Sequence, residues 1–98
     1  MNMQAMLKQA QNLQKDMLKV KGEIDNTEFV GESSLVKITS LGTKKVVKVE
    51  INKDEFNDDL DVEMLEDMIL LAINDVNKKI DDETEKKMSK FGNIPGLF

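Results

Sequence analysis

Residues 3–24 read MQAMLKQAQNLQKDMLKVKGEI, and their apolar positions alternate at intervals of three and four residues. This heptad spacing aligns the apolar side chains along one seam of a helix. The seam consists of Met3, Met6, Ala10, Leu13, Met17, Val20 and Ile24. The pattern predicts a helix over residues 2–24, about 33 Å long at a rise of about 1.5 Å per residue. One chain of 98 residues builds too small a core to cover such a helix. Part of it must pack on another chain or stand in solvent.

The pattern changes after Gly22 to short β-branched runs bounded by glycine or small polar residues. We expect three antiparallel strands within residues 26–51, with their apolar runs at residues 28–30, 35–40 and 45–51. The last run alternates, so one face of this strand should be apolar and the other mostly polar. Gly42 lies in the turn before it, where we expect glycine to adopt a positive φ.

A second helix is predicted over residues 60–90. Aspartates at its start offer N-caps and first-turn negative charge, which the helix dipole favours: Asp58, Asp59 and Asp61. The first half is apolar nearly all round, which is typical of a buried helix. The second half keeps only a thin apolar stripe among many charges, formed by Ile80, Thr84, Met88 and Phe91. This half should project into solvent before glycine and proline end the helix, leaving residues 91–98 as a short tail.

These elements predict an α+β fold of order α-β-β-β-α, with residues 1–98 forming a single domain. Half of the second helix would back a small three-stranded antiparallel sheet, and two charged helical arms would project beyond it. Such a chain exposes a heptad seam and open sheet edges. We therefore predict a homodimer that covers both.

The composition excludes several kinds of site. The chain contains no Cys, His, Trp or Tyr, which removes disulfides, thiolate and imidazole metal sites, and the commonest catalytic base. No serine has an imidazole to activate it, so we expect neither an enzyme nor a cofactor. No run approaches the roughly 20 apolar residues of a membrane span, and the first ten residues lack the apolar core of a signal peptide. We expect a soluble cytoplasmic protein with no membrane partner.

The net charge of -5 argues at first against a nucleic-acid partner, but its distribution is uneven. Residues 1–53 carry a net charge of +3, residues 54–77 carry -9 and residues 78–98 carry +1. The acidic segment lacks the glycine that a calcium loop needs at its sixth position, so helix capping explains it better than a metal site. All fourteen cations are Lys, which meets phosphate as a point charge but lacks the planar fork by which Arg reads guanine.

Two groups of lysines are candidates for phosphate contacts. On the first predicted helix, Lys8 and Lys15 lie seven residues apart and opposite the seam, and Lys19 follows them. The second group occupies the outer half of the second helix and consists of Lys78, Lys79, Lys86, Lys87 and Lys90. An ordinary solvated helix surface, or cations that complement the helix dipole, would use the same residues. Both interpretations stay open at this point.

Five segments of the chain resemble the YbaB/EbfC family, in the same order. They are MLKQAQNLQKDM (residues 6–17), VGESSLVKIT (30–39), KVEIN (48–52), MLEDMILLAINDVNKKI (64–80) and IPGLF (94–98). One departure is that family members usually carry extra glycines before the second strand, where this chain has a single glycine, Gly31. The resemblance implies a tweezer-shaped homodimer that binds DNA through its projecting helical parts and occurs in the bacterial cytoplasm, on the nucleoid.

We therefore predict a nucleoid-associated homodimer that binds double-stranded DNA mainly through phosphates. Its sequence preference would be weak, and it would affect nucleoid organisation and gene expression. The alternative is an adaptor in DNA replication or recombinational repair. In that case the heptad helix and the acidic segment would bind a partner protein, and contact with DNA would be indirect. Retardation of a duplex by the purified protein alone would separate the two.

Overall fold

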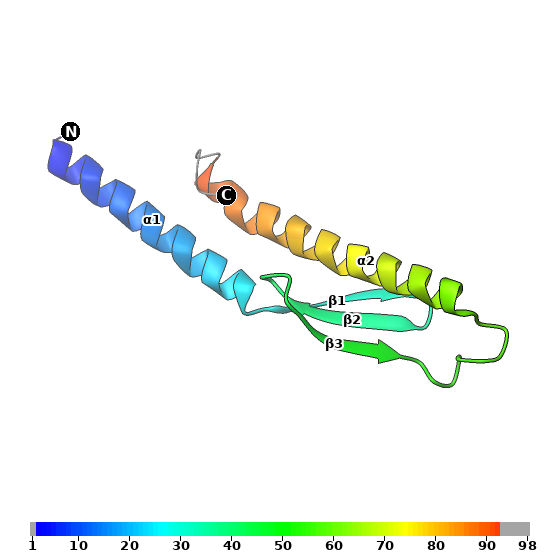
Figure 1. The fold of residues 1–98 in the computed structure, drawn as a ribbon. Helices are drawn as coiled ribbons and strands as arrows, with labels where there is room; N and C mark the ends of the chain where they lie inside the picture. Colours follow the sequence, from blue (N-terminus) through cyan, green and yellow to red (C-terminus); the bar gives the residue numbers. More distant parts are fainter. Residues whose placement is uncertain (1, 93–98) are drawn as a thin grey trace.

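The computed structural model describes residues 2–92 and contains the predicted order of elements (Figure 1). Helix α1 (Met3–Asp25) leads into an antiparallel sheet of three strands, β1 (Glu28–Ser33), β2 (Val36–Leu41) and β3 (Val46–Ile51). Helix α2 (Val62–Met88) follows and ends in a 3-10 turn, η1 (Ser89–Phe91). The predicted α+β class is confirmed, and most of the predicted tail, residues 93–98, lies outside the described residues.

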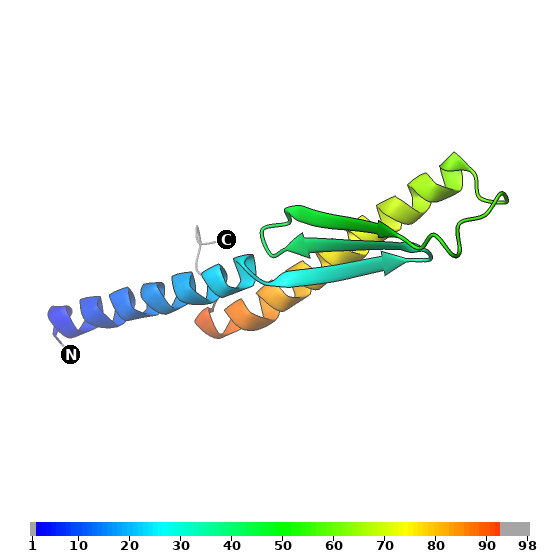
Figure 2. The ribbon, with the colours of Figure 1, turned by 90° about the horizontal axis from the view of Figure 1, so that it is seen from below.

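The molecule is elongated and measures 72 × 19 × 16 Å along its principal axes. Its radius of gyration of 19.4 Å exceeds the roughly 13 Å expected for a compact domain of this length. Helix α2 lies along the sheet, and α1 extends away from the sheet beside the end of α2 (Figures 1 and 2). The N-terminal half of α1 reaches past the end of α2, so no other described element covers it.

Both helices begin at side-chain caps. Asn2 Oδ1 accepts a hydrogen bond from the Ala5 backbone N–H at 2.7 Å, and Asp61 Oδ1 accepts one from the Met64 backbone N–H at 2.7 Å. Each cap satisfies a first-turn donor that has no partner within its helix. Of the three aspartates predicted to begin the second helix, Asp61 is therefore the one that caps it.

The outer edge of β1 is closed by two side chains of α2. Asp75 Oδ2 accepts a hydrogen bond from the Glu32 backbone N–H at 3.0 Å, and Lys79 Nζ donates one to the Val30 carbonyl at 3.0 Å. Strand β2 occupies the other side of β1. The free N–H and C=O groups of an edge strand are what a neighbouring chain would pair with. Helix α2 therefore hinders the pairing of another strand at this edge.

Close contact between α2 and β1 depends on Gly31. A Cβ at this position would lie 2.5 Å from both the Ala72 carbonyl oxygen and the Val76 backbone nitrogen. Both atoms belong to the helix backbone and cannot rotate away. The missing side chain therefore lets the helix axis approach the strand and bring Asp75 and Lys79 within hydrogen-bonding distance of it.

The turn between β2 and β3 corrects the expectation for Gly42. The positive φ, 72°, belongs to Lys44 and not to the glycine. Gly42 is needed for close packing instead, because its N–H donates to the Thr27 carbonyl at 3.0 Å and a Cβ there would overlap the Ile24 carbonyl oxygen. The glycine thus lets this turn pack directly on the end of α1.

The core has two parts that share α2. The first lies between the sheet and α2 and consists of Leu35, Val36, Ile38, Ala72, Val76 and Ile80. The second joins α1 to the end of α2 and η1 through Met17, Ile24, Met88 and Phe91. Only the C-terminal half of the heptad seam is therefore covered.

Helix α2 is covered differently from the prediction. Its first half is not buried on all sides, since Leu70 and Leu71 are 57% and 58% exposed. Its second half does not stand alone in solvent either, because Ile80, Met88 and Phe91 are buried. The physical reason is that a thin sheet covers only one side of the first half, while α1 packs on the stripe of the second half.

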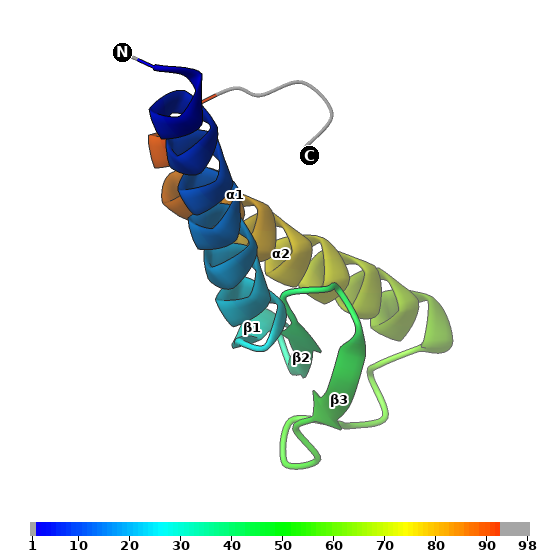
Figure 3. The ribbon, with the colours of Figure 1, turned by 90° about the vertical axis from the view of Figure 1, so that its left-hand side faces the viewer.

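Strand β3 is the least covered strand of the sheet. Helix α2 packs mainly on β1 and β2, and β3 lies away from both helices (Figure 3). Val49 pairs with Ile38, and Ile51 pairs with Val36, so both lie on the sheet face that α2 covers at β2. Val49 is nevertheless 54% exposed. The predicted apolar face of the third strand exists and is uncovered in the single chain.

Candidate nucleic-acid interface

Charge is segregated along the length of the molecule. Eight acidic residues fall within residues 54–67, in the β3–α2 loop and the first turns of α2. The opposite end is formed by residues 3–20 of α1 and residues 84–92 (Figure 1), which we call the helical arm. The arm carries six lysines and two acidic residues. A polyanion would be repelled by the loop end and attracted to the arm.

The three α1 lysines named from the sequence, Lys8, Lys15 and Lys19, are all exposed. The seven-residue spacing places Lys8 and Lys15 on one face of the helix, opposite the seam. Within residues 2–92, none of the three forms an ion pair. Their charges are thus not offset by a neighbouring carboxylate of the described chain.

Three of the five lysines named on the second helix are instead paired with acids of the same helix. Lys78 Nζ lies 2.7 Å from Asp82, Lys79 Nζ 3.1 Å from Asp75, and Lys87 Nζ 3.6 Å from Glu83. The hydrogen bond to Asp82 raises the pKa of Lys78 above its ordinary 10.5. Hydrogen bonds from the Glu32 backbone N–H and then from Lys79 lower the pKa of Asp75 below its ordinary 3.8.

Lys86 and Lys90 form no ion pair with residues 2–92. Lys90 Nζ lies 5.0 Å from the centre of the Phe91 ring, a distance suited to a cation–π contact. Lys90 also lines an open groove of about 470 Å³ together with Lys19, between α1 and the end of α2. The structure thus brings together lysines that are seventy-one positions apart in the sequence.

The lysines named from the sequence do not include every exposed lysine, and the surroundings of some of them were misassigned. Lys45, in the turn that packs on the end of α1, also forms no ion pair within the described chain. Its neighbour Lys44 pairs with Asp81 at 2.9 Å. The spacing of four between Lys78 and Asp82, and between Lys87 and Glu83, is a signal in the sequence that could have indicated pairing.

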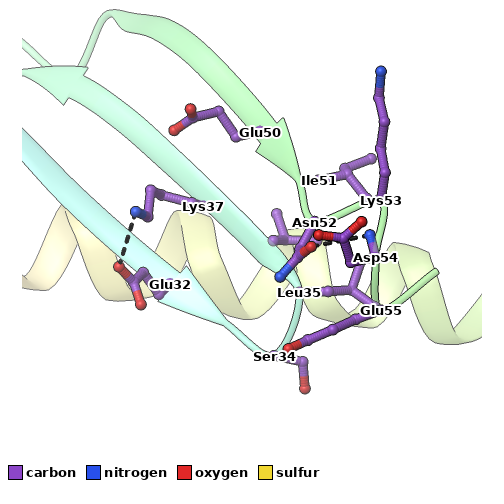
Figure 4. A pocket seen from close by; sticks show the side chains of 11 residues that line it. Glu32, Ser34, Leu35, Lys37, Glu50, Ile51, Asn52, Lys53, Asp54 and Glu55 are labelled. Carbon is purple, nitrogen blue, oxygen red and sulfur yellow. Dashed lines mark hydrogen bonds and ion pairs between the residues drawn. The ribbon is translucent and has the colours of Figure 1, made fainter.

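A larger pocket, of about 650 Å³, lies away from the arm, between the β1–β2 turn and the end of β3. Figure 4 shows that its wall is polar, with Lys37 3.7 Å from Glu32 and the Asn52 amide oxygen accepting a hydrogen bond from the Asp54 backbone N–H at 3.1 Å. Its charged side chains are four acids and two lysines, namely Glu32, Glu50, Asp54, Glu55, Lys37 and Lys53. This excess of acidic over basic side chains does not favour the binding of a phosphate group in the pocket.

Two other classes of site have no support in residues 2–92. No group of three or more His, Cys, Asp or Glu side chains is arranged to hold a metal ion there. None of the helices in this part of the chain combines the length and apolar character needed to cross a bilayer. The exposed lysines of the arm therefore remain the strongest candidate surface.

Comparison with known proteins identifies the family. Residues 1–94 match the model of the YbaB/EbfC DNA-binding family. A nucleoid-associated protein of Ligilactobacillus salivarius is 43% identical over 99% of this chain and 95% of its own length. A nucleoid-associated protein of Streptococcus sanguinis is 45% identical over 97% of this chain and 98% of its own length. The crystal structure of an uncharacterized Helicobacter pylori protein, HP0035, shares the fold, with a TM-score of 0.69 at 16% identity, over 88% of this chain and 91% of that one. The chain belongs to the YbaB/EbfC DNA-binding family.

Proposed function

We propose that this protein is a nucleoid-associated homodimer that binds duplex DNA through phosphate contacts from its helical arms, without catalysis. The observation that carries the proposal is the position of the lysines that form no ion pair within residues 2–92. Lys8, Lys15, Lys19, Lys86 and Lys90 lie on the arm, and the main acidic segment lies at the other end. Membership of a family described as DNA-binding, and relatives named nucleoid-associated, support the same function and a place on the nucleoid in the cytoplasm.

Recognition should depend mainly on the DNA backbone. Lysine contacts phosphate as a flexible point charge, and the chain has no arginine to make bidentate contacts with guanine. Phosphate contacts fix position on the duplex but carry no sequence information. We therefore expect weak sequence preference, and an influence on nucleoid organisation and gene expression that follows from general binding along DNA.

The homodimer is supported by the apolar surface that the single chain leaves exposed. Val49 and Ile51 continue the core face of the sheet beyond the reach of α2, and Leu70 and Leu71 are exposed on α2. The edge of β3 has no neighbouring strand in the described chain. A second copy related by a twofold axis would cover these surfaces and would place two arms on one assembly. Two arms can contact a duplex on both sides.

Salt dependence of DNA binding tests the assignment of the lysines. The apparent affinity should fall on a log-log plot with a slope of about -4 to -5 if four to six lysines of the dimer contact phosphates. Lys8→Gln with Lys15→Gln should weaken binding to all duplexes alike and flatten this slope by about 0.9 for each phosphate that is no longer neutralised. The matched control is Lys78→Gln with Lys87→Gln, which removes equal charge from paired lysines and should change the slope far less. Equal effects of the two variants would contradict the assignment.

Sedimentation tests the dimer. The protein should sediment at twice its chain mass of 11.1 kDa. Val49→Lys should produce a folded chain of half the dimer mass, because Val49 is exposed in the single chain and contributes little to its own core. Leu18→Lys, an exposed position on α1, is the control and should leave the dimer intact. A Val49→Lys protein that stays dimeric would move the interface elsewhere.

A protein-binding adaptor is the second candidate, favoured by the exposed Phe56 within the acidic loop. A large aromatic side chain surrounded by carboxylates is suited to a basic partner protein. Under this alternative, the purified homodimer alone would not retard a random-sequence duplex at low salt. A gel-shift titration with duplex as the only partner therefore decides between the two functions.

A further inference from the structure

All the glutamines of the chain lie in the N-terminal half of α1, and all are exposed: Gln4, Gln9, Gln11 and Gln14. Within residues 2–92, none of their side-chain amides forms a hydrogen bond with another group. The side-chain amides of Asn2 and Asn26, by contrast, bond to the backbone at the two ends of the same helix. The asparagines thus stabilise the fold, whereas the glutamine amides are available to an external ligand.

Two of these glutamines form a column beside the lysines of the arm. Each residue of an α-helix turns by about 100°, so Gln4 and Gln11 lie within about 60° of Lys8 and Lys15 around the helix. Leu7 lies between the two glutamines along the helix and further around from the lysines, and it is 60% exposed. The surface next to the lysine face is therefore uncharged and carries two amides and one apolar side chain.

The half of α1 that bears this column can enter the major groove of DNA. An α-helix with its side chains is about 10 to 12 Å wide, and the groove is about 12 Å wide. No other described element covers residues 3–14 (Figures 1 and 2), and residues 1–15 contain no acidic side chain. Neither the rest of the described chain nor charge repulsion therefore opposes entry. Lysines that contact phosphates at the edge of the groove would leave the adjacent column facing the bases.

We propose that Gln4 and Gln11 contact adenine in the major groove, that Leu7 contacts the methyl group of thymine, and that the protein therefore prefers A·T-rich duplex. This inference rests on the proposed function, because it takes the lysine contacts with phosphate as given. A side-chain amide carries donors and an acceptor side by side. The major-groove edge of adenine matches it with an amino group and a ring nitrogen, whereas guanine presents two acceptors there. The thymine methyl group is the other major-groove feature specific to an A·T pair.

The spacing of the two glutamines limits how much sequence they can read. Seven residues of helix rise about 10 Å, which corresponds to about three base steps of about 3.4 Å. The two amides would therefore contact bases about three pairs apart, and no amide lies between them in the same column. Such contacts select base composition and not one site. We expect a preference of about tenfold, which is modest beside the roughly thousandfold or more of site-specific proteins.

Duplexes that are altered only in the major groove test the proposal. In gel-shift titrations at one salt concentration, the parent protein should bind an A·T-rich duplex about tenfold more tightly than a G·C-rich duplex of equal length. Replacing adenine by 7-deazaadenine removes the ring nitrogen that accepts the amide hydrogen, and replacing thymine by uracil removes the methyl group. Each replacement should lower the affinity of the parent protein for the A·T-rich duplex.

Variants assign each effect to a side chain. Gln4→Ala with Gln11→Ala should lower the A·T preference and abolish the sensitivity to 7-deazaadenine, and Leu7→Ala should abolish the sensitivity to uracil. The matched control is Gln9→Ala, because Gln9 lies about 140 to 160° around the helix from the other two; it should behave as the parent. All these variants keep the lysines, so the salt slope and the sedimenting mass should stay unchanged.

The outcomes separate this inference from the proposed function. An A·T preference that survives both 7-deazaadenine and the loss of Gln4 and Gln11 would come from the shape of the DNA and would overturn the inference. Equal affinity for A·T-rich and G·C-rich duplexes, with the lysine-dependent salt slope intact, would overturn the inference alone. A protein that binds no duplex would overturn the proposed function as well.

Discussion

Substitution of Gly31 by Ala should separate α2 from the sheet. The new Cβ would lie 2.5 Å from the Ala72 carbonyl oxygen and from the Val76 nitrogen, where ordinary contact distances are about 3.5 to 4.0 Å between carbon atoms. Because both neighbours are helix backbone, α2 must move by about an ångström. Overpacking of this kind costs about 1 to 3 kcal/mol.

The displacement has a second cost at the edge of β1. The hydrogen bonds of Asp75 to the Glu32 N–H and of Lys79 to the Val30 carbonyl are both 3.0 Å long, so an ångström of movement would break them. Their loss adds to the overpacking cost of about 1 to 3 kcal/mol. The overpacking cost alone is a large share of the typical 5 to 15 kcal/mol that stabilises a domain.

Urea denaturation followed by circular dichroism, at one fixed protein concentration, measures this loss. Gly22→Ala is the matched control, because a Cβ at Gly22 meets no atom within 4 Å. Gly22 lies inside α1, so alanine should stabilise the helix there by about 0.5 to 1 kcal/mol. The two Gly→Ala variants should therefore change stability in opposite directions. A Gly31→Ala protein as stable as the parent would refute the close contact between α2 and β1.

Three further predictions concern stability. Ile80→Ala should lower the free energy of unfolding by about 2 to 5 kcal/mol, because Ile80 is 1% exposed; a thermal melt within a few degrees of the parent would contradict the core assignment. Below pH 3.8 the protein should lose the stability that the Asp75 carboxylate contributes. The pKa of this carboxyl is lower in the folded protein than its ordinary 3.8, so its ionised form stabilises the fold above pH 3.8, and this contribution is lost as the pH falls through the folded pKa. The melting-temperature difference between the parent and Asp75→Asn should therefore be constant near neutral pH and shrink in acid, and a constant difference at all pH values would disprove the role of the pair. Lys86→Ala should leave the melting temperature unchanged, since this exposed side chain has no partner in residues 2–92, whereas Lys79→Ala should lower it by removing the bond to Val30.

The features of the fold that depend on local periodicity and on helix capping could be predicted from the sequence. The heptad spacing located α1, Asp61 marked the start of α2, and the alternation in residues 45–51 identified an apolar face on β3. It did not predict how α2 is covered, because burial depends on which partner lies beside each face. The role of Gly42 was also missed, since a turn signal looks the same whether glycine supplies a positive φ or a close contact.

The sequence identified the lysines of the candidate site but not which of them form ion pairs with acidic side chains. All eight lysines named from the sequence are exposed on α1, α2 or η1, yet three of them have acidic partners one turn away. The role of Lys79 in closing the edge of β1 joins residues forty-nine positions apart, which no helical spacing reveals. The groove shared by Lys19 and Lys90 likewise exists only because α1 packs on the end of α2.

The closure of one sheet edge also limits how the protein can assemble. A chain whose sheet has two free edges can pair with another copy of the chain at each edge, and such pairing can continue indefinitely, as it does in fibres. Here Asp75 and Lys79 bind two backbone groups at the outer edge of β1, the Glu32 N–H and the Val30 carbonyl, so within the described chain the edge of β3 is the more open to another sheet. Two copies that join through their single free edges leave none for a third. The same two side chains that fix α2 would therefore disfavour the addition of a third copy by strand pairing.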